Sequence, residues 1–133
     1  MIAATDAIAR SHPCLILADA DPTFAAAVER SFRRLGWDVY PARTGPEARR
    51  LARMLGPSLV VLGAELPGES GWLTCDKLTR EFPSLWVILV APEPDDGQRR
   101  FAAFVGAAAL VREADGAFAL VREFTAASLP AAG

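Results

Sequence analysis

The side chains best able to do chemistry lie just past the ends of short apolar runs. Asp19 and Asp21 follow the run CLILA, and Glu113 follows the run AALVR. Carboxylate oxygens are good ligands for Mg²⁺ or Ca²⁺, so these acids could hold a cation. We favour a solvated acidic edge instead, because two or three loosely spaced carboxylates are weak evidence for a metal site. The run VVLG ends differently, because its last residue, Gly63, has no side chain to react.

Other kinds of reactive site find little support in the sequence. The only histidine, His12, excludes a His-rich metal site and restricts any Ser/His/Asp set. The first apolar run continues into DADPTF, which lacks the glycines of a phosphate-binding loop. Cys14 and Cys75 are the only cysteines, and both lie in apolar segments, so we expect buried free thiols. We therefore expect a protein that is not an enzyme and has no metal site.

Length and charge restrict the function further. A chain of 133 residues fits one domain, and we place it at residues 13–126, with loose ends at 1–12 and 127–133. The net charge of −2 gives no electrostatic reason to expect binding to nucleic acid or to an anionic membrane. No apolar run reaches the roughly 18 residues of a membrane span. The N-terminus lacks the basic region and long apolar core of a signal peptide, so we expect a cytoplasmic location.

Hydrophobic patterning predicts alternating strands and helices. The apolar runs are short and continuous, as in strands buried on both faces; they lie at residues 14–18, 37–40, 58–63, 85–91 and 108–112. The intervening segments have apolar residues at helical spacing, and the first helix should bury Phe24, Val28, Phe32 and Leu35. Capping patterns predict helix starts after Asp21, Thr44 and Ser70.

This alternation predicts a parallel sheet with helices on both faces. Sheets of this kind place their sites at the carboxyl ends of the strands, near the point where the strand order reverses. The residues at or just past the predicted strand ends are Asp19, Gly63, Ala91 and Glu113. We expect these four residues to lie at one edge of the sheet.

In the same order, five segments resemble the receiver domain of response regulators, the CheY-like superfamily. They cover about residues 13–126, and they read ILADADP, GWDVYPARTGPEARRL, LVVLGAELPGESG, WVILVA and FVGAAALVRE. The resemblance implies a flavodoxin-like (βα)5 fold: a three-layer α/β sandwich whose five parallel strands follow the order 2-1-3-4-5. It also implies a role in two-component, or phosphorelay, signal transduction.

The reactive set of that family is largely missing here. In such receivers an aspartate after the third strand attacks phosphate, and acids after the first strand help to hold Mg²⁺. The turn PGESG matches the family's P-G-x-x-G and places Gly63 at the acceptor position. The second acid, the phosphate-binding hydroxyl and the lysine are replaced by Ala20, Ala91 and Glu113. Asp19 alone matches the set.

The resemblance therefore implies a degenerate, or pseudo-, receiver. We expect it to lack phosphorylation at the usual position, to have lost Mg²⁺ binding and to need no cofactor. It should act by protein–protein interaction, with a kinase, an output domain or another signalling protein as its partner. The sequence leaves open a phosphorylated receiver that uses a substitute residue, such as Glu65, Ser70 or Thr44. It also leaves open a flavodoxin-like sensor of a small ligand or cation.

The fourth helical segment and the fifth strand contain the candidate partner contacts. Receivers commonly dimerise or contact their output domains through the face made by the fourth helix, fifth strand and fifth helix. Arg99, Arg100, Phe104 and Leu110 fall in this region and are our candidates for partner binding, including homodimerisation. The helical spacing nevertheless favours Phe101 and Phe104 as core residues, with the two arginines in water.

Overall fold

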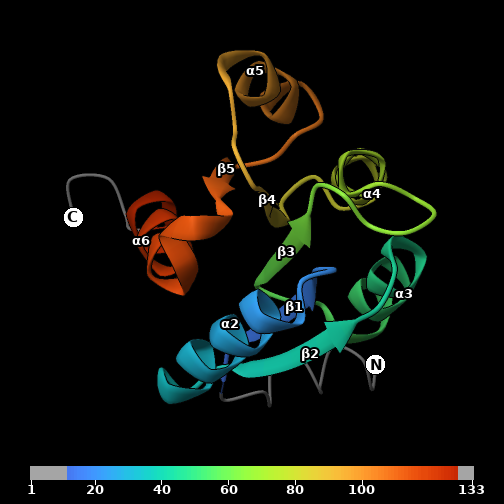
Figure 1. The fold of residues 1–133 in the computed structure, drawn as a ribbon. Helices are drawn as coiled ribbons and strands as arrows, with labels where there is room; N and C mark the ends of the chain where they lie inside the picture. The colour runs from blue at the N-terminus through green and yellow to red at the C-terminus, as the bar shows by residue number, and fades with distance from the viewer. Residues whose placement is uncertain (1–11, 129–133) are drawn as a thin grey trace.

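The structure, a computed structural model, describes residues 12–128, which form a three-layer α/β sandwich (Figure 1). Five parallel strands make one sheet in the order β2-β1-β3-β4-β5. The strands are β1 (Cys14–Ala18), β2 (Asp38–Ala42), β3 (Leu59–Gly63), β4 (Trp86–Ala91) and β5 (Ala109–Arg112). The predicted fold class and strand order are confirmed. The predicted tails at 1–12 and 127–133 lie almost wholly outside the described residues.

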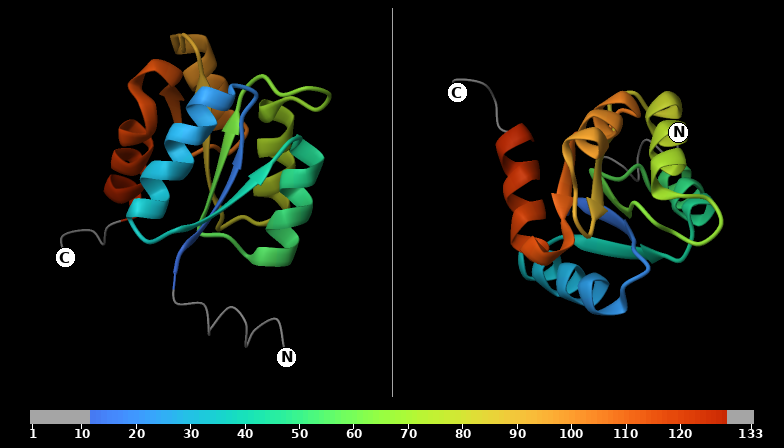
Figure 2. Two further views of the ribbon diagram at one scale, coloured as in Figure 1. Left: turned by 60° about the horizontal axis from the view of Figure 1, so that its bottom comes forward. Right: turned by 45° about the horizontal axis from the view of Figure 1, so that its top comes forward.

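Helices cover both faces of this sheet (Figure 2). They are α2 (Pro22–Arg34), α3 (Gly45–Leu55), α4 (Gly71–Glu81), α5 (Asp96–Phe104) and α6 (Gly116–Ser128), with a 3₁₀ turn, η1 (Glu113–Asp115), before α6. Helices α2 and α6 pack on one face, and α3, α4 and α5 pack on the other. No helix within residues 12–128 is long and apolar enough to cross a membrane.

Two apolar cores lie on the two faces of the sheet. Side chains alternate along each strand, so in β3 Val60 faces α3 and α4 while Val61 faces α2 and α6. Both are fully buried, which explains why the strands read as continuous apolar runs. Burying each such side chain stabilises the fold by roughly 1.5–3 kcal/mol.

The predicted helix caps are confirmed. The side chains of Asp21, Thr44 and Ser70 accept hydrogen bonds from backbone N–H groups in the first turns of α2, α3 and α4. The capping box predicted at Thr44 differs in one detail. The Glu47 carboxylate accepts from the N–H of Arg43, at 2.7 Å, rather than from the N–H of Thr44. Short-range polar patterns thus fix where these helices begin.

Three large apolar residues depart from the expected core. Phe101 and Phe104 are 46% and 80% exposed, so their assignment to the core is wrong. The reason is that α5 packs against the sheet through Ala102, and the two rings lie outside that contact. Leu35 is 57% exposed because α2 ends one residue earlier, at Arg34. Phe118, on α6, is 73% exposed.

Both cysteines are buried, as expected, and Cys75 belongs to the core beneath α3, α4 and α5. Burial, with a smaller contribution from the Asp76 carboxylate, raises the pKa of the Cys75 thiol to about 12. A thiol must lose its proton to become a nucleophile or a metal ligand. Cys75 is therefore an inert, structural residue at neutral pH.

Candidate functional site

The strand ends bring the predicted site residues together. Gly63 is the last residue of β3 and Ala91 the last of β4, and Gly63 is paired in register with Val90. Asp19 follows the end of β1, which is the neighbour of β3. A Cβ atom built on Gly63 would lie 3.0 Å from Oδ2 of Asp19. The acceptor position and the retained acid are therefore direct neighbours.

The backbone at Gly63 does not require glycine. Gly63 is not among the described glycines whose φ angle is positive, the region that favours this residue. The contacts nearest to an added Cβ are atoms of Asp19, with the flexible carboxylate closest. A side chain could therefore be accommodated with a small movement of Asp19. Folding alone does not explain the absence of a side chain at this position.

Gly71 differs from Gly63 in this respect. A Cβ atom on Gly71 would overlap the carbonyl oxygen of Gly63. The N–H of Gly71 also donates to the carbonyl of Ala64, at 2.9 Å, and the N–H of Ala64 donates to Val90, at 2.7 Å. The β3–α4 turn is thus folded tightly against the end of β3. The second glycine of the turn is required by close packing, so the turn is kept for structural reasons.

Three acidic side chains gather beside this position. Burial raises the pKa of the Asp19 carboxyl, although the Asp21 N–H donates to Asp19 Oδ1 at 2.8 Å and opposes that rise. A hydrogen bond between the side chains of Asp21 and Glu113 raises the pKa of Glu113 to about 7 and lowers that of Asp21. The charge of Asp19 adds to the rise at Glu113. We call Asp19, Asp21 and Glu113 the strand-end acids.

Among the described residues, no Lys or Arg side chain forms an ion pair with the strand-end acids. The guanidinium of Arg112, the residue before Glu113, lies 4.0 Å from the carboxylate of Glu93. Within residues 12–128, no group of three or more His, Cys, Asp or Glu side chains is arranged to hold a metal ion. Asp21 and Glu113 line an open hollow of about 390 Å³ between α2 and the end of β5. Of the predicted set, Ala20 is exposed whereas Gly63 and Ala91 are buried.

The substitute acceptors have other roles or surroundings. The hydroxyl groups of Thr44 and Ser70 accept capping hydrogen bonds, at 3.1 and 3.2 Å. Glu65 is exposed on the loop that follows β3. These positions match the simple structural interpretation of each residue, a cap or a solvated loop.

A carboxylate network that sequence reasoning missed lies next to this edge. Glu69, in the turn between β3 and α4, accepts two hydrogen bonds from Arg49, at 3.1 and 3.2 Å. It also accepts from the Thr74 hydroxyl, at 2.6 Å, and from the Lys77 ammonium, at 2.9 Å. Burial favours the neutral form of Glu69, but these donors outweigh it and lower its pKa to about 2. We call Glu69 with its three donors the loop clamp.

The clamp ties the β3–α4 turn to α3 and α4. The Glu69 side chain is 10% exposed and that of Arg49 is 21% exposed, so both charges are largely removed from water. Arg49 lies 20 residues earlier in the chain than Glu69. No local pattern indicates a pair so distant in sequence, and Glu69 occupies a position that the turn motif leaves variable.

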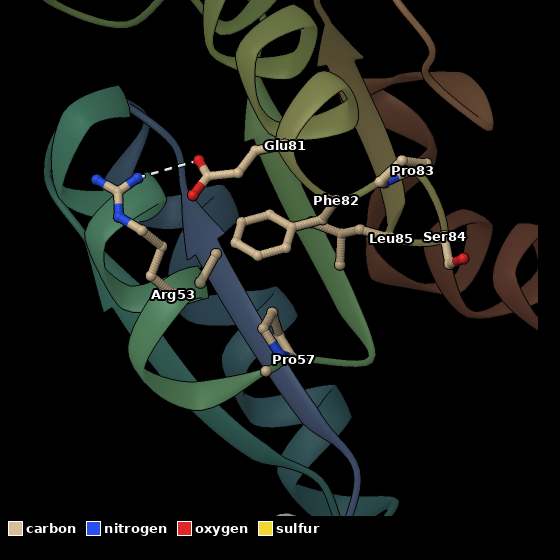
Figure 3. Close-up of a pocket in the computed structure, with 9 residues that line it drawn as sticks. Arg53, Pro57, Glu81, Phe82, Pro83, Ser84 and Leu85 are labelled. Carbon is tan, nitrogen blue, oxygen red and sulfur yellow. Dashed lines mark hydrogen bonds and ion pairs between the residues drawn. The ribbon is translucent and has the colours of Figure 1, made fainter. Parts of the chain in front are cut away.

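Another hollow, of about 480 Å³, lies away from the strand-end acids (Figure 3). It is formed where α3 and α4 end and where the chain approaches β3 and β4. The Phe82 ring lies beside an ion pair of 3.1 Å between Arg53 and Glu81. This hollow contains none of the residues predicted for the site.

The candidate partner residues separate into exposed and buried positions. Arg99, Arg100 and Phe104 are exposed on α5. Leu110 is only 7% exposed and belongs to the core under α3, α4 and α5, so its assignment as a partner contact is corrected. The guanidinium of Arg99 donates to the Leu110 carbonyl, at 3.1 Å, which joins α5 to β5.

Comparisons with known proteins agree with this fold. No family model matches the chain. It is 36% identical over 76 residues to the probable transcriptional regulatory protein TcrX of Mycobacterium tuberculosis, a match to 57% of this chain and 32% of TcrX. It is also 32% identical over 69 residues to the DNA-binding dual master transcriptional regulator RpaA of Synechocystis. That match covers 52% of this chain and 29% of RpaA. The chain thus matches about a third of each relative's length.

The solved structures include the chemotaxis protein CheY4 of Vibrio cholerae. It superposes with a TM-score of 0.81 at 14% identity, covering 87% of this chain and 98% of CheY4. The class is therefore the CheY-like receiver fold. The two relatives found by sequence, which are transcriptional regulators by name, are more similar in sequence, at 36% and 32% identity.

Proposed function

We propose that this chain is an atypical receiver domain that signals through protein–protein contacts and is not phosphorylated at the usual position. The observation that carries the proposal is Gly63, which has no nucleophile although its backbone would accept another residue. A transferred phosphoryl group needs an acceptor oxygen at this point. The retained neighbour, Asp19, follows a different strand and is held by the Asp21 N–H.

The charges around Gly63 support the same proposal. A phosphoryl group is strongly anionic and is normally stabilised by cations and hydrogen-bond donors. Here Glu113 replaces the lysine expected from the receiver resemblance, and it shares a hydrogen bond with Asp21. Bound phosphate would meet carboxylates rather than donors. Mg²⁺ binding is lost in this proposal because Ala20 replaces the second acid.

The proposed partner is a kinase, an output domain or another signalling protein. RpaA is a DNA-binding regulator by name, but the match covers only 29% of it, so DNA binding is not carried over to this chain. The exposed residues Arg99, Arg100 and Phe104 make α5 our candidate contact element, with homodimerisation through α5, β5 and α6 as one form of it. We place this non-enzymatic function in the cytoplasm.

Intact mass spectrometry tests the proposal. The chain is incubated with acetyl phosphate and Mg²⁺, beside a conventional receiver that serves as a positive control. We expect the control to gain about 80 Da, the mass of one phosphoryl group, while this chain stays unmodified. A stoichiometric adduct on this chain would contradict the proposal, and peptide mapping would then decide between Glu65, Ser70 and Thr44.

A further inference from the structure

A groove of about 380 Å³ runs between α4 and α5. Most of its wall is apolar, and its lining residues are Ser70, Trp72, Leu73, Asp76, Arg80, Phe101, Phe104 and Val105. This groove is distinct from the strand-end acids and lacks the buried Leu110. It faces outward between two helices that cover the same side of the sheet.

Three aromatic rings form a continuous row along the groove. The centroids of Trp72 and Phe101 lie 5.3 Å apart, and Phe101 stacks with Phe104 at 6.1 Å. Leu73 extends the surface on α4 and is 45% exposed. Exposed apolar patches often mark interaction sites. Aromatic residues are also enriched among those that contribute most to binding.

The exposed rings are not needed to build the core of the domain. Helix α5 is anchored to the sheet by Ala102 and Val105, which are 3% and 5% exposed. Phe104, at 80% exposed, keeps most of its apolar surface in water. Leaving such a side chain exposed forgoes roughly 1.5–3 kcal/mol of hydrophobic free energy. A partner that covers the ring would recover part of it.

The charges on the two sides of the groove differ. On α4 the Arg80 guanidinium is neutralised by Asp76, one turn earlier, with two contacts of 3.1 Å. On α5, Arg100 precedes the two phenylalanines and makes no hydrogen bond or ion pair with any described residue. Asp96 lies one turn before Arg100 but does not pair with it in this structure. Arg100 is not part of the groove lining, but it lies one turn before Phe104 on the same face of α5, so its charge can meet a partner's carboxylate at the edge of the groove.

We propose that this groove binds an amphipathic helix of a partner protein, with its apolar face on the aromatic row and an acidic flank against Arg100. A helix laid in a groove presents anchors at positions i, i+3, i+4 and i+7, which suits a row of rings between two helices. The proposal deepens the proposed function by naming the partner's chemistry. It rests on that function only in assuming that signalling uses a protein contact.

The experiment titrates the full chain with a synthetic helical peptide, followed by NMR. The probe has about 14 residues, with Leu at the anchor positions, Glu along one flank and Ala elsewhere to favour the helix. We expect the largest shifts at the Trp72 indole N–H and at the amides of Phe101 and Phe104. Phe104→Asp should weaken binding tenfold or more, in the range of an interface hot spot. Phe118→Asp, which changes a similarly exposed ring on α6, is the matched control and should leave the affinity unchanged.

Arg100 is tested by charge reversal. Arg100→Glu should lower the affinity for the Glu peptide and raise the affinity for a peptide in which Lys replaces Glu, because the charge at residue 100 is then reversed. Several outcomes would overturn the proposal: no binding of the peptide, shifts centred elsewhere, or equal losses in Phe104→Asp and Phe118→Asp. Self-association that Phe104→Asp abolishes would assign the groove to a second copy and also overturn it. The mass measurement with acetyl phosphate is independent, so the two proposals can fail separately.

Discussion

Two groups of carboxylates flank the turn after β3, and they differ in their hydrogen-bond partners and in the direction in which their pKa values shift. In the loop clamp, Glu69 receives hydrogen bonds from two cations and a hydroxyl, and its pKa is lowered to about 2. Among the strand-end acids, Glu113 has a carboxyl group as its partner, and its pKa is raised to about 7. One group is a structural network whose charges are paired, and the other consists of like charges with no ion-pair partner within residues 12–128.

The difference separates the scaffold of the receiver fold from its chemistry. The clamp holds the β3–α4 turn through contacts with α3 and α4 that involve no phosphate or metal. The turn can therefore persist when the neighbouring position, Gly63, has no acceptor. The strand-end acids lie beside Gly63, at the edge of the sheet where the strands end. Mutations in the two groups should therefore have different effects on stability.

The largest effect is expected for Glu69→Gln. This change removes the charge that neutralises Arg49 and Lys77, and it leaves the largely buried guanidinium unpaired. Breaking a buried pair costs up to 3–5 kcal/mol, and partial exposure reduces the expected loss in unfolding free energy to about 2–3 kcal/mol. Urea denaturation of the variant and of the parent chain measures this loss in unfolding free energy.

Glu81→Gln is the matched control for that measurement. It breaks the pair with Arg53, whose side chains are 45% and 40% exposed. An exposed pair contributes less than about 1 kcal/mol. Equal losses in the two variants would show that the clamp is no stronger than a surface ion pair.

Gly63→Asp should lower the unfolding free energy by a smaller amount. The new side chain starts 3.0 Å from Asp19 Oδ2 and adds a fourth carboxylate to the strand-end acids. We expect a loss of about 1–2 kcal/mol at pH 7 from like-charge repulsion at short range. Gly63→Asn has nearly the same shape without the charge, so it should lose less. If the two variants are equally stable, charge does not dominate this edge.

The smallest effect is a difference in pH dependence. The folded-state pKa of Glu113 is raised from 4.5 to about 7. The contribution of Glu113 to the unfolding free energy is therefore fully present below pH 4.5 and is lost as the pH rises towards 7. Solvent screening should keep this fall below about 1 kcal/mol. The pH dependence expected for Glu69 has the opposite sign, because its pKa is lowered. Its contribution to the unfolding free energy is present above pH 4.5 and is lost as the pH falls towards 2.

Chemical denaturation at a series of pH values tests both signs. Glu113→Gln should remove the decline in stability between pH 4.5 and 7. Glu69→Gln should remove the steep loss below pH 4.5 while leaving the decline at higher pH unchanged. A Glu113→Gln variant with the same pH profile as the parent chain would show that the raised pKa does not influence folding.

Much of the fold was predictable from the sequence because its signals are local. Strands buried on both faces give continuous apolar runs, and caps such as Asp21 use residues within one turn. The strand order followed from the resemblance to receivers. The exposure of Phe101 and Phe104 was not predictable from spacing, because Ala102 and Val105 supply the contacts that anchor α5.

The site was predictable only in part. The strand-end positions, including Asp19 and Gly63, follow from the topology of a parallel sheet. The hydrogen bond between Asp21 and Glu113 and the raised pKa that it produces depend on side-chain positions that spacing does not give. Glu69 was missed because its strongest partner, Arg49, is remote in sequence and lies on another helix.

The central claim is that the phosphorylation site is disabled at several positions together. The most direct test is the intact mass of Gly63→Asp after incubation with acetyl phosphate and Mg²⁺. The restored acceptor would still lack the second acid at Ala20 and would still face Glu113 instead of a lysine. We predict that the variant stays unmodified. A gain of about 80 Da at residue 63 would contradict the account, because one substitution would then have restored the chemistry.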